Sequence, residues 1–491
     1  MARIVVIGAG VAGLGTALCA SRAGHRVTIV ERDAPPPPGA PPGAFDWARR
    51  GAPQVRHSHA FLARLRNLLR DRHPDVLAAL FAAGATEMDF IRMLPDGMDR
   101  TPRPGDEDLV AIACRRTTFE WVLRRTVLED ASVELRHGAA VTGVRAAPAD
   151  RGTVPLVDGV VLDDGSVLDA EVVVAAGGRR ADVPALLAPH GVTVPEEEED
   201  TGIISLPRFF ALLDGRDPPP QLGPIGGDLG YLKYGVFPGD NRTFSITLAV
   251  ATDDAELRRV LLDPERFLRV AAALPATAAH VEADRSRPIT GVEVMGGLIN
   301  RRRRFLDDHG APLVLGLHAV GDAHTATNPL YGRGCSLALV QAQLLCDALD
   351  GAGLDHDARA RAYEASTRLE VTPWYRAAVN QDRLNRRAAT PEPGLVDPAA
   401  GDDGTCPAGG DGTDPADFVR SLLRDGLFPA MRVDPVVLRA FLRMFNLLEA
   451  PDSLLNDADV IGRVMAVYQD KDNRPPEPEL GPDRDGLLAA V

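Results

Sequence analysis

The sequence predicts an α/β protein with a parallel sheet, an inserted antiparallel sheet and a helical C-terminal region. Three patterns lead to this fold class: a strand, a helix and a strand open the chain, alternating apolar residues recur in its middle, and helical spacing dominates after about residue 355. The chain has 491 residues, of which 45% are hydrophobic and 25% charged. It is therefore long enough for two or three domains and has the composition of a globular protein.

Charge and cysteine content exclude several classes of protein. The net charge is -15, so a broad basic surface is missing and nucleic acid is not expected as a partner. The five cysteines are odd in number and form no Cys-x-x-Cys pair. This argues against a disulfide framework or a zinc site and favours a cytoplasmic setting. No run of 18 or more apolar residues occurs, so no membrane-spanning helix is expected, and the oligomeric state stays open.

The first element is a strand–helix–strand unit. Residues 3–7 form a short apolar strand, residues 14–23 suit a helix, and residues 26–30 alternate like a second strand. Between strand and helix stands Gly8-Ala9-Gly10-Val11-Ala12-Gly13, a G-x-G-x-x-G pattern that carries little weight alone in a glycine-rich chain. Its position, and Glu31 at the end of the next strand, give it weight. Together they predict a Rossmann-like site for a dinucleotide.

Each residue type in this motif has a physical role. Gly8 permits the tight turn, Gly10 lets the backbone approach a pyrophosphate, and Gly13 lets the helix pack closely on the strand. The first helical amides then hold the anion, and Glu31 accepts hydrogen bonds from ribose hydroxyls. The contacts expected here are Gly8, Gly10, Val11, Ala12, Gly13, Glu31 and Arg32.

Further elements follow in order. A proline-rich stretch at 35–42 predicts an exposed loop. Helical spacing indicates helices at 61–69, 74–82, 118–129 and 336–349. Strand patterns occupy 133–144, 154–174 with a hairpin turn at Asp163-Asp164-Gly165, 203–213, 230–249, 292–299 and 312–320. The acidic run at 196–200 is expected to be a solvated loop at a domain boundary.

A second glycine-containing segment lies near residue 330. The strand at 314–320 ends in Gly321-Asp322-Ala323, and Asn328-Pro329-Leu330-Tyr331-Gly332-Arg333-Gly334 precedes the next helix. In these residues the sequence resembles the flavin monooxygenases of the p-hydroxybenzoate hydroxylase fold. The resemblance extends to about residue 350. It implies bound FAD, with Asp322 at the ribityl chain and the proline and glycines against the isoalloxazine ring. The implied contacts are Gly321, Asp322, Pro329, Gly332 and Gly334.

Three further segments resemble parts of the same family. Arg115 or Arg116, before a Phe-Glu pair, is similar to the segment whose arginine contacts the cofactor, and Arg115 is assigned this role. Val141 stands where the family's backbone meets the adenine. In residues 172–179, Ala175 replaces the usual aspartate, a departure that puts direct use of NAD(P)H in doubt. The expected electron donor is therefore either NAD(P)H or a separate flavin reductase.

The expected domains are discontinuous. Residues 1–75, 105–190 and 290–352 are assigned to an FAD-binding domain, and residues 76–104 and 191–289 to a substrate-binding domain. Residues 353–491 form a C-terminal helical region. Within it, proline, glycine and acidic residues indicate a flexible loop at 391–414 and a flexible tail at 474–491.

The resemblance implies an FAD-dependent monooxygenase, a hydroxylase or epoxidase of secondary metabolism. Such an enzyme inserts one oxygen atom of O2 into a hydrophobic small molecule through a flavin C4a-(hydro)peroxide, and few acid or base residues are obligatory. The candidate catalytic residues are Arg56, His59 and Tyr331. Aromatic residues of the second sheet are either a substrate lining or ordinary sheet core. Those assigned to the lining are Phe210, Tyr231, Tyr234 and Phe237.

Other functions stay open beside this one. A flavin-dependent reductase of the geranylgeranyl-reductase type shares the cofactor motifs, and a non-redox FAD-binding protein keeps the fold without redox turnover. A flavin halogenase is disfavoured because the Trp-x-Trp-x-Ile-Pro signature is absent. The basic run at 301–304 is expected to be a solvated strand end, with recognition of an acidic substrate as the alternative.

Overall fold

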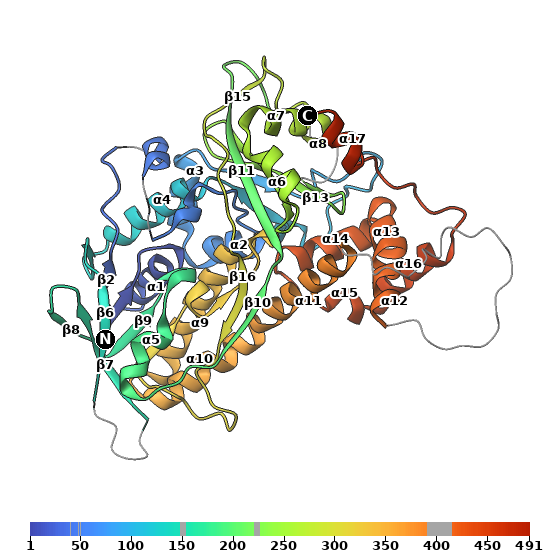
Figure 1. The fold of residues 1–491 in the computed structure, drawn as a ribbon. Coiled ribbons are helices and arrows are strands. Elements are labelled where there is room, and N and C mark those ends of the chain that lie inside the picture. The colour runs from blue at the N-terminus through green and yellow to red at the C-terminus, as the bar shows by residue number, and fades with distance from the viewer. Residues whose placement is uncertain (40, 48, 50, 148–153, 220–225, 390–414) are drawn as a thin grey trace.

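A parallel sheet of five strands, in the order β17, β9, β1, β2 and β5, combines strands from the first 175 residues with one edge strand from residues 317–319. The computed structural model describes every residue except 40, 48, 50, 148–153, 220–225 and 390–414 (Figure 1). The strands are β1 (Arg3–Ile7), β2 (Arg26–Glu31), β5 (Val133–His137), β9 (Val172–Ala175) and β17 (Leu317–Ala319). Valine and isoleucine dominate the central strands because both faces of the sheet are covered.

Helices cover one face of this sheet and a smaller sheet covers the other. On the helical side α1 (Val11–Arg22) packs against α9 (Gly334–Ala352), and α4 (Arg116–Leu128) lies beside α1. The opposite face carries the three-stranded sheet β6 (Val141–Ala147), β7 (Leu156–Leu162) and β8 (Val167–Asp169). The hairpin predicted between β7 and β8 is confirmed, as the two strands pair antiparallel.

A second sheet is antiparallel and has the strand order β12, β13, β14, β11 and β15. Its strands are β11 (Ile203–Leu212), β12 (Gly226–Asp228), β13 (Leu232–Pro238), β14 (Thr243–Ala251) and β15 (Ser286–Pro288). One face packs on α6 (Ala255–Leu262), α7 (Pro264–Ala273) and α8 (Pro275–Ala278). The other face turns toward the parallel-sheet region, where Phe209 meets Phe45 at 5.2 Å between ring centroids. The predicted fold class is confirmed.

The acidic run at 196–200 is a strand, and the expectation of a solvated loop is wrong. β10 (Glu196–Asp200) pairs antiparallel with β16 (Ile299–Arg303), which also pairs with β18 (Thr325–Ala326). Each arginine of 301–303 lies opposite one glutamate of 196–198 and forms an ion pair with that strand. Opposite charges across the strands offset the repulsion within each run. Because these arginines are paired within the chain, the basic run gives no support for recognition of an acidic substrate.

The helices predicted before residue 350 are confirmed. They are α2 (Ala63–Arg72), α3 (Pro74–Ala82), α4 and α9. A short pair of strands, β3 (Thr86–Asp89) and β4 (Val110–Ala113), lies beside α2, and α5 (Val183–Leu187) follows β9. No helix among the described residues is long and apolar enough to cross a membrane.

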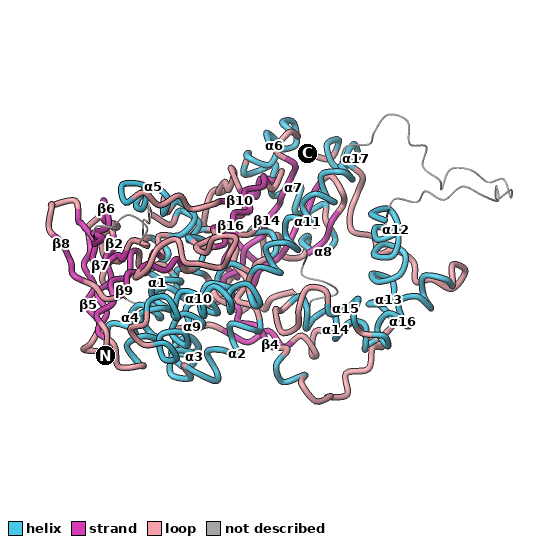
Figure 2. Tube along the Cα trace, turned by 90° about the horizontal axis from the view of Figure 1, so that it is seen from below, coloured by secondary structure: helices cyan, strands magenta, loops and turns pink. Residues whose placement is uncertain are grey.

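The C-terminal region consists of two long helices and a separate helical cluster. α10 (His356–Glu370) packs on α9, and α11 (Thr372–Ala389) runs along β16. The cluster is formed by α12 (Pro415–Leu422), α13 (Phe428–Val433), α14 (Pro435–Phe445), α15 (Ser453–Asn456) and α16 (Ala458–Gln469), which share a small apolar core. Figure 2 shows it extending beyond the sheets on one side. The loop predicted at 391–414 lies outside the described residues.

The last residues, whose composition predicts a flexible tail, lie against the antiparallel sheet instead. α17 (Arg484–Ala489) buries Leu487 in the core formed by this sheet and α7. The hydroxyls of Tyr231 and Tyr234 donate hydrogen bonds to tail carbonyls, at 2.8 and 3.1 Å. Arg484 forms an ion pair with Asp254 at 3.0 Å. Composition misses this arrangement because the tail is held by contacts with distant residues.

Candidate active site

The first glycine motif leaves an open space in front of α1. Gly8 has a φ of +104°, and a Cβ there would lie 2.8 Å from the carbonyl oxygen of Ala176. A Cβ on Gly13 would lie 1.9 Å from the oxygen of Gly8, so these two glycines are required by the fold itself. A Cβ on Gly10 would meet nothing within 4 Å. No side chain caps the N-terminus of α1, so this space fits the pyrophosphate of a dinucleotide.

Glu31 is buried at the end of β2 and supports the glycine turn. Its Oε2 atom accepts a hydrogen bond from the backbone N–H of Ala9 at 2.8 Å. Its Oε1 atom accepts one from the N–H of Asp33 at 2.9 Å. Arg32, the other residue predicted here, is exposed and lies beside Gly51. The carboxylate therefore fixes the turn that faces the open space, in addition to the ribose role predicted for it.

A buried arginine that the sequence did not single out links three carboxylates at this end of the site. Arg49 donates to Glu120 at 2.7 Å, to Asp33 at 3.1 Å and to Glu31 at 3.2 Å. Its guanidinium lies 4.4 Å from the ring centroid of Trp47. Arg49, its three carboxylates and Arg116 are called the Arg49 cluster below. The cluster holds the segment that contains Arg49 against β2 and α4.

The second glycine motif meets the first. Gly321 follows β17 with a φ of +67°, and a Cβ there would lie 2.8 Å from the Cβ of Ala12 in α1. Its N–H donates to Gln341 of α9 at 2.8 Å. Asp322 lies next, with a carboxylate oxygen 3.6 Å from Arg179. Two segments far apart in the sequence therefore lie side by side at the start of α1.

The segment from Asn328 to Gly334 forms a tight turn before α9. Pro329–Tyr331 make a single 3-10 turn, and Gly332 closes it with a φ of +66°. A Cβ on Gly332 would lie 2.9 Å from the Cβ of Ala60. At Gly334 a Cβ would meet only Asp322 Oδ1, at 3.9 Å, and no side chain caps α9. A second helix N-terminus thus opens beside the predicted ribityl-binding aspartate.

Of the two adjacent arginines, Arg116 lies on the side of the predicted flavin contacts. Arg115 is held by Asp240 of the antiparallel sheet through its N–H, Nε and Nη2, at 2.7 to 3.1 Å. Arg116 donates to Glu120 at 2.7 Å and contacts His59 Nε2 at 3.0 Å. Despite its burial, Glu120, with Asp322 contributing, raises the pKa of Arg116 above its usual range. The structure places a permanent cation here, while Arg115 joins the start of α4 to the turn between β13 and β14.

The Arg-His-Ser-His segment passes between the two sheets. Burial and Arg116 keep the pKa of His59 well below its usual range, so its ring is neutral. His59 Nδ1 contacts the carbonyl of His57 at 2.9 Å. Ser58 contacts Ser245 of β14 at 2.7 Å, while Arg56 ends a short 3-10 turn and is half-buried. His59 is therefore near the predicted flavin contacts through Arg116.

The residues assigned to the substrate lining lie on different faces of the antiparallel sheet. Phe210 and Tyr234 belong to the core beneath α7, on the face turned away from the glycine motifs. Phe237 and Phe209 both lie opposite Ser245, so they share the face turned toward the motifs. For Phe210 and Tyr234 the structure supports the sheet-core reading. Both faces are apolar, so the sequence alone could not assign the alternation to one side.

Tyr231 lines a small cavity, and Tyr331 contacts Asp382, another residue of its lining. The cavity has a volume of about 60 Å³, and its lining includes Tyr231, Lys233, Asn328, Leu330 and Asp382. The Tyr331 hydroxyl donates to Asp382 of α11 at 2.7 Å. Asp382 is a second residue that the sequence did not single out, because a lone acid in a helical segment has no distinguishing pattern. The cavity lies between the segment predicted to face the flavin and the edge of the antiparallel sheet.

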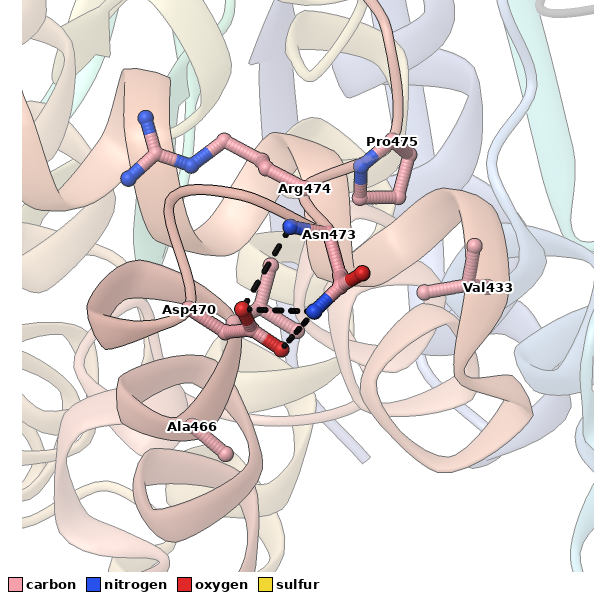
Figure 3. A pocket seen from close by; sticks show the side chains of 7 residues that line it. Val433, Ala466, Asp470, Asn473, Arg474 and Pro475 are labelled. Atoms are coloured by element: carbon pink, nitrogen blue, oxygen red, sulfur yellow. Dashed lines mark hydrogen bonds between the residues drawn. The ribbon is translucent and has the colours of Figure 1, made fainter.

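A larger cavity of about 380 Å³ lies in the C-terminal helical cluster (Figure 3). It is lined by Val433, Ala466, Val467, Asp470, Asn473, Arg474 and Pro475. Asn473 folds back onto Asp470 through hydrogen bonds of 3.0 to 3.3 Å. None of the predicted site residues lines it, and it is separate from the site described above.

Comparisons with known proteins agree with this geometry. A family model described as FAD dependent oxidoreductase matches residues 3–97. PqsL of Pseudomonas aeruginosa, described as a probable FAD-dependent monooxygenase, is 20% identical over 79% of this chain and 96% of its own, with a TM-score of 0.55. The chain has the fold of the FAD-dependent monooxygenases. The predicted resemblance in fold is thereby confirmed.

Two other proteins share this monooxygenase fold over most of the chain. The flavin-dependent brominase Bmp2 is 16% identical over 94% of this chain and 98% of its own, with a TM-score of 0.59. The Diels-Alderase PyrE3 of pyrroindomycin biosynthesis is 16% identical over 91% of this chain and 80% of its own, with a TM-score of 0.56. A comparison with curated proteins gives no match. At these identities the fold is shared, while the reaction depends on the residues of the site.

Proposed function

We propose that the protein is an FAD-dependent monooxygenase, a hydroxylase or epoxidase, that adds one oxygen atom of O2 to a hydrophobic small molecule. The observation that carries the proposal is the close approach of Gly321 to Ala12, which brings the two glycine motifs side by side. Both helices that start there lack a side-chain cap. The shared fold of PqsL supports the same class of reaction.

The residues around this space suit the two halves of FAD. Gly10 leaves room for the pyrophosphate, and we assign the ribose of the adenosine half to Glu31 and the ribityl chain to Asp322. Bound FAD, once reduced, supplies the electrons that activate O2 and delivers one oxygen atom to the substrate. The residues proposed to hold it are Gly8, Gly10, Val11, Ala12, Gly13, Glu31, Arg32, Val141, Gly321, Asp322, Pro329, Gly332 and Gly334, with Arg116 beside them and Arg115 behind it.

The chain's own contribution is to hold the substrate, exclude water and supply a fixed positive charge. Phe209 and Phe237 give the facing side of the antiparallel sheet an aromatic surface suited to a hydrophobic substrate. The Arg116 guanidinium favours negative charge that develops near it. The neutral ring of His59 contacts this cation and limits its movement. Arg56, His59 and Tyr331 remain the candidate catalytic residues.

The electron donor and the compartment are part of the proposal. Ala175 lies buried at the end of β9, where the resembled family has an aspartate, and this favours delivery of electrons by a partner flavin reductase over direct use of NAD(P)H. The described cysteines are free, which supports a reducing compartment such as the cytoplasm. Oxidation of NAD(P)H by the purified protein without an added reductase would identify NAD(P)H as the direct electron donor.

A non-redox function is the second candidate, supported by the fold shared with the Diels-Alderase PyrE3. In that case FAD, if bound, has a structural role and the substrate changes without a change in the flavin. The small cavity beside Leu330 and Asp382 then serves binding alone. The reaction assay described next separates the two candidates.

The proposal is tested by rapid mixing. The flavin of the purified protein is reduced without oxygen and mixed with oxygenated buffer while the visible absorption is recorded. A transient band at shorter wavelength than that of oxidised flavin, and a product heavier by one oxygen atom, are expected. Direct reoxidation with every candidate substrate and no such product would overturn the proposal. Substrate conversion with flavin that stays oxidised would establish the non-redox candidate.

A further inference from the structure

A buried carboxylate on α11 gathers three side chains from two other parts of the chain. Asp382 Oδ2 accepts a hydrogen bond from Asn300 Nδ2 of β16 at 2.6 Å. Its Oδ1 atom accepts from Asn328 Nδ2 at 2.9 Å and from the Tyr331 hydroxyl at 2.7 Å. Asp382, Asn300 and Asn328 are at most 1% exposed. These four residues are called the Asp382 cluster.

Backbone contacts fix the direction of both amide groups in this cluster. The Oδ1 atom of Asn300 accepts the N–H of Asn328 at 2.7 Å. The Oδ1 atom of Asn328 accepts the N–H of Leu330 at 3.0 Å. Since the amide oxygens are used in this way, both NH2 groups point at Asp382. All three partners of Asp382 are therefore donors, which is the arrangement suited to an ionised carboxylate.

The Asp382 cluster is not part of an ion-pair network in the contacts described. Asp382 lies on the same helix as Arg386, and its nearest partners are neutral. Burial raises the pKa of Asp382, while its hydrogen bonds to Tyr331 and the two asparagines, together with the charge of Arg386, act in the opposite direction. A carboxylate held in this manner is costly to bury, and its three short bonds are the compensation.

α11 also contacts the segment from Asn328 to Arg333 at Trp374, which lies about two helical turns before Asp382. The guanidinium of Arg333 lies 4.8 Å from the ring centroid of Trp374 and 4.9 Å from that of Tyr331. Tyr331 is thus held at its hydroxyl by Asp382 and at its ring by Arg333. The turn from Asn328 to Arg333 is the segment proposed to face the flavin, and α11 contacts it at two points.

We propose that Asp382 is a positioning residue for the cofactor, by which the C-terminal helical region fixes the turn that faces the flavin. The carboxylate holds Asn328 at the start of the turn and Tyr331 at its end, so it sets the path of the backbone between them. It also places one negative charge next to the turn that is proposed to face the flavin. This inference rests on the FAD binding put forward in the proposed function.

The test compares Asp382→Asn, Asp382→Ala and Tyr331→Phe with the wild-type protein. The control is Gln381→Ala, on the same helix, whose exposed side chain contacts only Asn385 in the described structure. FAD affinity is measured by titration of the apoprotein, and the bound flavin is characterised by its visible spectrum and midpoint potential. Thermal unfolding of each apoprotein reports whether the variant folds.

Asp382→Asn is expected to bind FAD about tenfold more weakly, the effect of losing one charge-assisted hydrogen bond. Its midpoint potential is expected to move to a more positive value, because a negative charge that disfavours the anionic reduced flavin is gone. Tyr331→Phe keeps the carboxylate, so it is expected to weaken FAD binding and change the flavin spectrum with a smaller change in potential. Gln381→Ala is expected to match the wild type.

Three outcomes decide the inference. An Asp382→Asn variant that folds and keeps the affinity, spectrum and potential of the wild type overturns it. If both Asp382 variants fail to fold, Tyr331→Phe decides, and a wild-type spectrum and affinity in that variant overturn the inference. A wild-type protein that binds no FAD overturns the proposed function itself, which is a different result from any of these.

Discussion

The two buried polar clusters on either side of the site balance their charges in opposite ways. In the Arg49 cluster, one guanidinium is shared by Glu31, Asp33 and Glu120, so cations and anions neutralise one another. In the Asp382 cluster, a single carboxylate is held by neutral donors. Removing one member of the first cluster leaves an uncompensated buried charge, whereas removing one member of the second mainly releases a turn. The Arg49 cluster is therefore expected to contribute mainly to the free energy of unfolding. The Asp382 cluster is expected mainly to fix the position of the turn from Asn328 to Arg333.

The largest expected effect is the loss of FAD on substitution of Gly10, which lies between the two clusters. Gly10→Val adds a side chain where nothing lies within 4 Å, so the protein is expected to fold but to lose FAD, because the backbone no longer reaches the pyrophosphate. The free energy of unfolding of the apoprotein is expected to change by less than about 1 kcal/mol. Purification followed by the visible spectrum checks the first point and urea unfolding the second.

Gly8→Ala is the contrasting variant for this prediction. Gly8 has a left-handed φ, and a Cβ there would lie 2.8 Å from a backbone oxygen, so both FAD and stability are expected to fall. A Gly10→Val protein purified with its full yellow colour would contradict the site assignment.

The Arg49 cluster is tested by Arg49→Met. The substitution leaves three carboxylates without their shared cation, and the free energy of unfolding is expected to fall by about 3 kcal/mol. Urea unfolding of the apoprotein measures it. The matched control is Arg304→Met, because Arg304 is 39% exposed and forms its ion pair with Asp308. That change is expected to cost less than about 1 kcal/mol. Equal losses in the two variants would contradict the comparison.

Acid is expected to act through His57 and through Asp382 with opposite signs. Burial and Arg116 lower the pKa of His57 from 6.5 to about 4. In that interval the unfolded chain binds more protons, so lowering the pH reduces the free energy of unfolding, by at most about 1.4 kcal/mol per pH unit from this residue. For Asp382, whose pKa is raised, the folded chain binds more protons and lowering the pH stabilises it.

Urea unfolding between about pH 7 and about pH 5 checks this prediction, with His57→Gln as the comparison. The wild type is expected to lose more stability over this range than the variant. The same slope in both proteins would show that the titration of His57 does not contribute.

The sequence predicts the parts of the site that depend on local geometry. Gly8 and Gly13 are required by close backbone contacts, and such contacts leave a motif in the sequence. The sequence leaves Phe210 open between a substrate lining and the sheet core, because apolar residues fill both faces of the sheet and the alternation alone gives no direction. Arg49 and Asp382 could not be found, since their partners lie far away in the chain and each stands in an unremarkable local context.

The pairing of the two charged runs also could not be predicted, because the runs lie far apart in the sequence. A run of five acidic residues and a run of four arginines each suggest a solvated segment when taken alone. In the folded chain the two runs pair in register, as β10 and β16. Only this long-range pairing shows that the glutamates of one run form ion pairs with the arginines of the other.

This pairing brings together the two ends of the long segment that contains the antiparallel sheet. Asp200 lies opposite Ile299, and all the strands of that sheet come from the residues between them. The segment therefore leaves and re-enters the rest of the molecule at a single place. Leu487 of α17, from outside the segment, completes the core of its sheet, so the segment and α17 pack as one unit. The charged strand pair is the place where both chain connections of this segment to the rest of the molecule lie.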